Sequence, residues 1–255
     1  MTRTLHPFVL LLTALLLTAP VQMASAQGQV YVIESTTGAV KVGTAFALDE
    51  RITVPAGASI RIVLPSGKTQ TIKGPYSDPV ANLAKGQKAN DGVMAWIKTL
   101  MQTGGSNERT PGATRSARAP GSPPSSAGFS WIAIPVTADS TICVEKRAKL
   151  ELRRSPSPRA ERFSVVDMKT EQRAEVEFAP GSETASWPAG VAPRPDGEYV
   201  FLAPENRPRR QVTLRVLDSL PGEDDVLAEL AARDCKHQFD AWVREKMTAG
   251  KGKAS

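Results

Sequence analysis

The sequence contains few of the residues that most often carry catalysis or bind metals. Its 255 residues include only two histidines, and one of these, His6, lies in a leader-like segment. The other, His237, is two residues from Cys235 in a stretch of helical pattern, where such neighbours do not face each other. The motifs H-E-x-x-H and G-x-S-x-G are missing, and no carboxylate pair has a persuasive catalytic spacing. We therefore expect a non-catalytic protein without a metal site or cofactor.

Long hydrophobic runs are also missing beyond the first 26 residues, since none approaches the roughly 18 apolar residues of a membrane-spanning helix. The amino-terminal segment combines a positive charge at Arg3, a short apolar run at 8–17 and the small-x-small tripeptide 24–26. This pattern predicts a signal peptide over residues 1–26 with cleavage after Ala26. The alternative is an uncleaved anchor, although a proline and a glutamine interrupt the apolar run. We expect a soluble periplasmic or secreted protein that is not an integral membrane protein and has no nucleic-acid partner.

Cysteine is equally scarce. Cys143 and Cys235 are the only two, which is too few for a zinc site of their own. In an oxidising compartment an even count favours a disulfide, and we predict that these two residues pair. Two buried free thiols are the alternative. The predicted bond would attach the helical carboxy-terminal segment to an early strand of the second domain.

Turn-forming residues are plentiful, with 20 prolines and 19 glycines, and short alternating strands lie between them. The clearest example is the segment 52–75. Apolar residues alternate with polar ones through Ile60 and Ile62, the tetrapeptide 65–68 (Pro-Ser-Gly-Lys) can turn the chain, and alternation then resumes. This pattern predicts a β-hairpin. Strands of similar length recur from residue 29 onward, a rhythm typical of a small sandwich, barrel or β-solenoid.

These residues resemble the FecR-like periplasmic domain over about residues 30–75. The resemblance lies in a series of strand and turn positions: Gly38, Val40, Gly43, Ile52, Val54, Gly57, Ala58, Ile60, Leu64, Ser66 and Gly67. It implies a β-rich sensory or envelope module. The chain lacks the family's cytoplasmic regulator region and transmembrane helix, so the resemblance implies a free periplasmic module rather than signalling to a sigma factor.

Two helices are expected after the hairpin region. The sequence Ser77-Asp78-Pro79 is a good helix start, and Asn90-Asp91 can cap a second helix over 92–102. The segment 105–128 is rich in proline, serine and arginine and poor in large apolar residues. Such a composition cannot bury enough surface to offset its ordering entropy, so we predict a disordered linker.

From Phe129 onward about seven short strands are expected, the number in an immunoglobulin-like or fibronectin-type sandwich. The stretch Asp196-Gly197-x-Tyr199-x-Phe201 resembles a late strand of such folds, in which a buried tyrosine closes the core. A single amphipathic helix, with Cys235 inside it, is expected to follow and to end near Met247.

The predicted fold class is therefore mainly β with a few helices. The expected organisation is a signal peptide, a FecR-like β-domain with helical cover, a linker, a β-sandwich-like domain with a carboxy-terminal helix, and a disordered tail, over 1–26, 27–104, 105–128, 129–248 and 249–255.

The chain carries a formal net charge of +6, which favours acidic partners if the charges are grouped. Two arginine clusters are candidate contacts for an anionic partner: Arg153, Arg154, Arg207, Arg209 and Arg210. The leading hypothesis is a non-catalytic envelope protein that acts as a binding or sensory module for an unidentified envelope protein. The alternatives are an envelope enzyme subunit and an electrostatic binder of an anionic envelope polymer.

Overall fold

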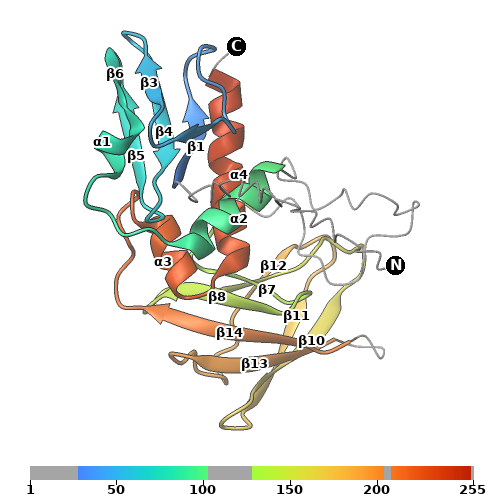
Figure 1. Cartoon of the computed structure of the whole chain (residues 1–255). Helices are drawn as coiled ribbons and strands as arrows, with labels where there is room; N and C mark the ends of the chain where they lie inside the picture. The colour runs from blue at the N-terminus through green and yellow to red at the C-terminus, as the bar shows by residue number, and fades with distance from the viewer. Residues whose placement is uncertain (1–27, 103–127, 204–207, 254–255) are drawn as a thin grey trace, which may run out of the picture.

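The computed structural model describes residues 28–102, 128–203 and 208–253 (Figure 1). The predicted signal peptide, its cleavage site at Ala26 and nearly all of the predicted linker lie outside these residues. The described chain is mainly β, with four helices, which confirms the predicted fold class. None of its helices combines the length and the apolar character that crossing a membrane requires.

The amino-terminal unit is a small β-structure built around the predicted hairpin. Its strands are β1 (Gln29–Ser35), β2 (Ala45–Ala47), β3 (Arg51–Val54), β4 (Ser59–Val63), β5 (Thr69–Lys73) and β6 (Tyr76–Pro79). Four of them form a sheet in the order β2-β1-β4-β5, and β3 pairs with β6. The antiparallel β4–β5 pair is the hairpin expected from the sequence. Gly67 in its turn has a φ of 87°, a conformation that glycine adopts without steric cost.

The four-stranded sheet has two apolar faces. One face packs towards β3 and β6 over a core that includes Val32, Ile52 and Ile62, all of them fully buried. The other face carries Tyr31, Ile33 and Val63, which are also buried. A sheet with both faces apolar needs a cover on each side, and the second cover comes from elsewhere in the chain.

The second β-unit is a sandwich of two sheets. Its strands are β7 (Ala133–Pro135), β8 (Ser140–Glu145), β9 (Glu151–Arg153), β10 (Glu161–Asp167), β11 (Arg173–Phe178), β12 (Thr184–Ser186), β13 (Gly197–Leu202) and β14 (Arg210–Leu217). The sheets have the orders β11-β10-β13-β14-β8 and β12-β9-β7. Their inner faces share one core, which contains Phe163, Phe178, Tyr199 and Phe201. This is the sandwich expected from the strand count, with one strand more than predicted.

The described residues also form four helices: α1 (Val80–Ala84), α2 (Asp91–Gln102), α3 (Val226–Ala232) and α4 (Lys236–Lys253). The α1 prediction placed Ser77 to Pro79 at the helix start, but these residues belong to β6, and the helix is only five residues long. The prediction for α2 is close, because the Asn90 side chain accepts a hydrogen bond from Val93 N and caps the helix.

The predicted single carboxy-terminal helix is wrong, because the segment forms two helices. Asp234 has a φ of 58°, and Cys235 N donates to Leu230 O at 2.8 Å, which closes α3 with a left-handed cap. Cys235 therefore lies in the break and not inside a helix. The second helix also extends to Lys253, beyond residue 248, where order was expected to end.

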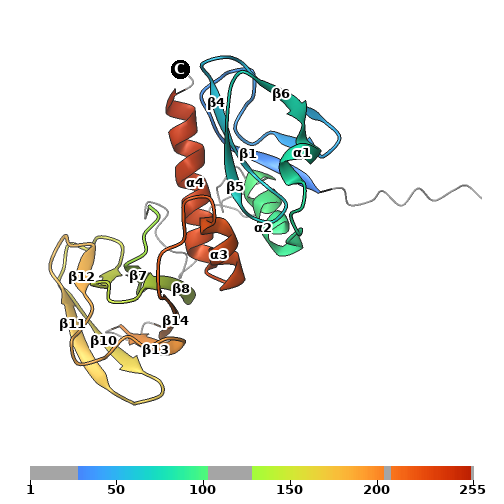
Figure 2. The ribbon, with the colours of Figure 1, turned by 90° about the vertical axis from the view of Figure 1, so that its left-hand side faces the viewer.

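A helical layer joins the two β-units. Figures 1 and 2 show α4 running beside β1 and reaching the sandwich at β8. We call the core of this layer the joint core; it comprises Tyr31, Ile33, Val63, Val93, Ile97, Leu100, Cys143, Leu217, Val226, Leu227, Leu230, Cys235, Phe239, Trp242 and Val243. The carboxy-terminal helices were expected to dock on the sandwich. The structure corrects this, because they also cover the open face of the amino-terminal sheet.

Polar contacts strengthen the attachment of the carboxy-terminal segment to the amino-terminal unit. Thr69 N on β5 donates to Asp224 O at 2.7 Å. The Arg61 guanidinium on β4 lies 3.2 Å from Glu223 and 3.5 Å from Asp224, with its side chain only 12% exposed. These contacts orient the start of α3 on the hairpin.

Candidate functional site

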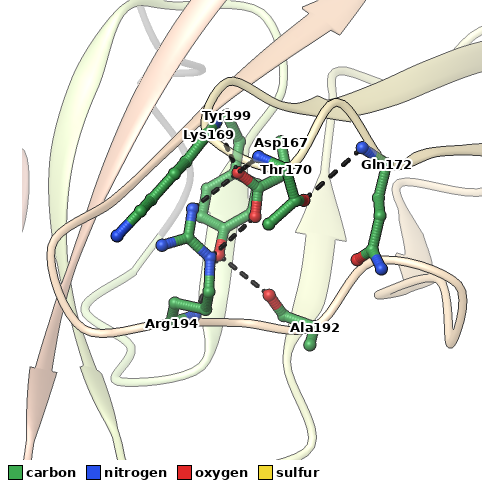
Figure 3. A network of polar contacts seen from close by, with 7 residues as sticks. All are labelled: Asp167, Lys169, Thr170, Gln172, Ala192, Arg194 and Tyr199. Carbon is green, nitrogen blue, oxygen red and sulfur yellow. Dashed lines mark hydrogen bonds and ion pairs between the residues drawn. The ribbon is translucent and has the colours of Figure 1, made fainter.

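The most perturbed carboxylate of the described chain belongs to Asp167, at the end of β10 (Figure 3). Arg194 binds it with two parallel hydrogen bonds, Nε to Oδ2 at 2.8 Å and Nη2 to Oδ1 at 2.5 Å. Lys169 N and Thr170 N also donate to Oδ1. The Asp167 side chain is only 1% exposed, so these four hydrogen bonds replace its hydration.

Tyr199 on β13 belongs to the same cluster. Its hydroxyl accepts a hydrogen bond from Arg194 N at 2.8 Å and donates one to Ala192 O at 3.0 Å (Figure 3). This bonding to upstream backbone matches the tyrosine corner described for immunoglobulin-type sandwiches. The cluster thus holds the loop before β13 against the end of β10.

The electrostatics of this cluster indicate a structural role. Hydrogen bonds from Arg194 hold the pKa of Asp167 well below its usual range, and burial raises the pKa of Tyr199. Asp167 is therefore ionised and Tyr199 protonated at neutral pH. Neither group is poised to exchange a proton near pH 7, as a general acid or base would be.

The two cysteines meet at the joint core. Cys143 on β8 and Cys235 between α3 and α4 have their Cα atoms 5.8 Å apart and their sulfur atoms at disulfide distance. Both residues are fully buried. The predicted pairing is present, but its position differs from the expectation, because the bond links the sandwich to the layer that covers both β-units.

Gln238 on α4 is a residue that the sequence reasoning missed. Its side chain accepts a hydrogen bond from Cys143 N at 2.6 Å and donates to Cys143 O at 2.8 Å and to Ser130 O at 2.7 Å. Because β8 is an edge strand, this amide satisfies backbone groups that would otherwise be unpaired. A glutamine within an amphipathic pattern gives no signal of such a role.

A polar groove lies on the outer face of the five-stranded sheet, where β8 and β14 run parallel. It has a volume of about 440 Å³ and is lined by Asp139, Ser140, Thr141, Arg209, Gln211 and Thr213. Gln211 and Thr213 alternate along β14 with the core residues Val212 and Leu214, which places their side chains outside the sandwich. The His237 ring, at the start of α4, lies 3.3 Å from Asp139 O.

The five candidate arginines do not form one basic surface. Arg153 and Arg154 belong to β9 and its end, in the three-stranded sheet, whereas Arg209 and Arg210 lie at the start of β14 in the other sheet. Arg209 is exposed and lines the groove, and Arg210 lies 3.8 Å from Asp139. Arg207 lies outside the described residues.

The structure contradicts the expectation that Arg154 is a surface contact. Its side chain is 1% exposed, pairs with Glu161 at 3.0 Å and lies 5.0 Å from the centre of the Phe178 ring. It also donates to Ala179 O at 3.1 Å. An arginine buried and paired in this way is inaccessible to a partner.

Comparison with known proteins found no matching family model, no matching curated protein and no matching solved structure. Within the described residues, no group of three or more histidine, cysteine, aspartate or glutamate side chains is arranged to hold a metal ion. The groove is therefore the candidate functional site that the structure offers on its own geometry.

Proposed function

We propose that the protein is an exported, non-catalytic binding module of the cell envelope, and that the groove between β8 and β14 is its binding surface. The groove is the observation that carries the proposal. Its lining combines hydroxyl and amide side chains on two paired strands with the Arg209 guanidinium and the Asp139 carboxylate just before those strands, a platform suited to recognition by hydrogen bonds.

Two features support export. The amino-terminal 26 residues have the composition of a cleavable signal peptide. Cys143 and Cys235, the only cysteines of the sequence, lie at disulfide distance, and such bonds persist mainly in oxidising compartments. We place the mature protein in the periplasm or outside the cell.

The backbone of the amino-terminal unit supports the resemblance to FecR-like domains. Gly43, Gly57 and Gly67 are glycines of the shared pattern, and all three have a φ between 78° and 90°. Other residues adopt this conformation rarely, so the pattern reflects turns that require glycine. We propose that this unit is a FecR-like module and that the sandwich is immunoglobulin-like, with Tyr199 as its tyrosine corner.

The experiment has two parts. Expression with the native leader, followed by fractionation and mass spectrometry, should place the protein outside the cytoplasm, beginning at Gln27 and with no alkylatable thiol.

The mature protein, immobilised and exposed to an envelope extract, should then retain a ligand, and a Thr141→Val, Thr213→Val double variant should lose it. Retention in the cytoplasm with the leader intact would refute export. Equal capture by both proteins would refute the groove as the binding surface.

A hydrolase assay of the same preparation separates binding from catalysis. We expect no turnover above that of a mock purification. Activity that a single acidic substitution abolishes would instead support the alternative of an envelope enzyme.

A further inference from the structure

The groove contains side chains that can donate hydrogen bonds but have no partner among the described residues. Thr141 and Thr213 stand opposite each other in the parallel pairing of β8 and β14. Arg209, which immediately precedes β14, also lines the groove. In the described chain, neither the Arg209 guanidinium nor either threonine hydroxyl takes part in a hydrogen bond or ion pair. Among the described residues, the exposed Arg162 and Arg173 are paired with glutamates, whereas Arg209, like Arg147 and Arg159, is not.

The acidic groups near the groove are already engaged. Asp139 accepts a hydrogen bond from Gln211 N at 2.8 Å through Oδ1, and its Oδ2 lies 3.8 Å from Arg210. Glu198 on the neighbouring strand β13 accepts a hydrogen bond from the Gln211 side chain at 3.5 Å. Asp139 remains 65% exposed, so the groove offers a ligand the unpaired Arg209 guanidinium, the two threonine hydroxyls and one partly paired carboxylate, with the His237 ring beside them. The unpaired guanidinium favours a ligand that carries a negatively charged group.

The rest of the groove lining is polar, which narrows the class of ligand. The large apolar side chains exposed on the described surface are Met168 and Leu220, and neither lines the groove. An acyl chain or an apolar peptide would find no complementary surface there. Hydroxyl and amide groups match the hydroxyls of a sugar, and the guanidinium matches a carboxylate or phosphate on it.

We infer that the groove binds an acidic glycan, a sugar chain bearing carboxylate or phosphate groups, with Arg209 on the acidic group and Thr141, Thr213 and Gln211 on the sugar. The inference rests on the proposed function, since it names the ligand class of the same surface. A volume of about 440 Å³ accommodates one or two sugar units. A longer chain would continue along the outer face of the sheet.

The test is calorimetric titration of the mature protein with four probes: a tetrasaccharide of galacturonic acid, mannose 6-phosphate, a neutral tetrasaccharide and phosphatidylglycerol vesicles. We expect binding of at least one acidic sugar and no measurable binding of the neutral one. Preference between the first two probes decides whether carboxylate or phosphate is the recognised group. Binding only to vesicles, or equal binding of neutral and acidic sugars, would overturn the inference.

Matched variants separate a built site from general charge attraction. Arg209→Ala should weaken binding at least tenfold, whereas Arg159→Ala removes the same charge from an exposed site outside the groove and should leave the affinity unchanged. The Thr141→Val, Thr213→Val variant keeps the charge and the strand propensity, and should also weaken binding. Equal loss in both arginine variants would show non-specific attraction and overturn the inference.

The inference and the proposed function can fail separately. If no acidic sugar binds but the groove variant still loses the ligand captured from envelope extract, the binding function stands and the glycan assignment falls. If the extract yields no ligand and no sugar binds, both fall.

Discussion

The sandwich and the amino-terminal unit bury their apolar surface in different ways. The core of the sandwich is formed by residues between Ile134 and Leu214 alone, so its two sheets close on each other. The amino-terminal sheet closes one face with its own strands and the other with helices that begin more than a hundred residues later. Its Trp96 and the carboxy-terminal Phe239 meet edge to face, with ring centres 5.2 Å apart.

This difference shows that segments far apart in the sequence build one structural unit together. The sandwich has what an independent domain requires, a contiguous core of its own. The second apolar face of the amino-terminal sheet is buried only when the carboxy-terminal helices pack against it. The disulfide between Cys143 and Cys235 attaches those helices to the sandwich. Five predictions test the comparison, from the largest expected effect to the smallest.

Separating the two parts of the chain should have the largest effect. Residues 28–102 alone would expose apolar side chains of β1, β4 and α2 that the joint core buries. At about 1.5–3 kcal/mol for each large side chain, the loss is on the order of 10 kcal/mol, comparable to the whole stability of a domain. We expect this fragment to lack a cooperative thermal transition, whereas the fragment 128–255 should retain one. Mixing the two fragments should restore a cooperative transition of the amino-terminal unit. A sharp transition in the isolated amino-terminal fragment would contradict the comparison.

Removing the disulfide should come next. Closing a loop with a sequence separation of 92 contributes at most about 4–5 kcal/mol in the chain-entropy model. A bond wholly within the second domain, as expected from the sequence, would make Cys143→Ser weaken that domain alone. In the structure the bond lies in the joint core, so the substitution should loosen the packing of that core. The urea midpoint monitored at Trp96, which packs against the joint core, should therefore fall more than the midpoint monitored at Trp187 in the sandwich core. A larger fall at Trp187 would instead support a disulfide that stabilises the second domain alone.

The Asp167–Arg194 pair tests the sandwich alone. Arg194→Ala leaves a buried carboxylate without its main partner and should cost about 2–3 kcal/mol, less than a fully buried pair because Arg194 is 27% exposed. The control, Arg162→Ala, breaks an exposed pair and should cost less than about 1 kcal/mol. Urea unfolding that gives equal losses for both variants would refute the structural role of the cluster.

The same pair predicts a pH dependence. The pKa of Asp167 is lower in the folded state than its ordinary value of about 3.9. Its contribution to the free energy of unfolding is thus fully present above that value and is lost as the pH falls towards the folded-state pKa. The stability difference between the protein and an Asp167→Asn variant should therefore shrink on acidification below about pH 4, measured by urea unfolding at several pH values.

The smallest expected effect is at Gln238. Its replacement by alanine would leave the N–H and C=O of Cys143 without their partners on the edge of β8, at a cost of about 1–2 kcal/mol. Gln238→Glu is the matched control, since it keeps the acceptor but loses the amide donor. Faster hydrogen exchange at Cys143 N in the alanine variant than in the glutamate variant is the expected readout. Equal exchange rates would show that α4 protects this edge by packing alone.

Local patterns were sufficient for much of the fold. Alternation around Ile60 and Ile62 and the turn glycine Gly67 predict the hairpin because they act over a few residues. The buried place of Tyr199 was instead implied by the resemblance of its stretch to a late strand of immunoglobulin-like folds, and Tyr199 is fully buried. The helix break at Asp234 was missed, since a left-handed aspartate leaves no mark in the apolar periodicity that continues on either side.

Most of the candidate site could not be predicted from the sequence. The exposed arginine Arg209 and the buried Arg154 look alike as residues in basic clusters, and only the packing around Phe178 distinguishes them. Thr141 and Thr213 are far apart in the chain and have ordinary strand neighbours. Only the parallel pairing of β8 and β14 brings them to one groove.

By itself, the sequence determined the mainly β class, the positions of most strands and the identity of the cysteine pair, because alternation, turn residues and residue counts are local or compositional properties. The tertiary structure alone decided that the carboxy-terminal helices serve both β-units, that Gln238 satisfies the edge of β8 and that a polar groove forms beside it. These features depend on which apolar faces meet, and the burial that selects them is a property of the assembled chain.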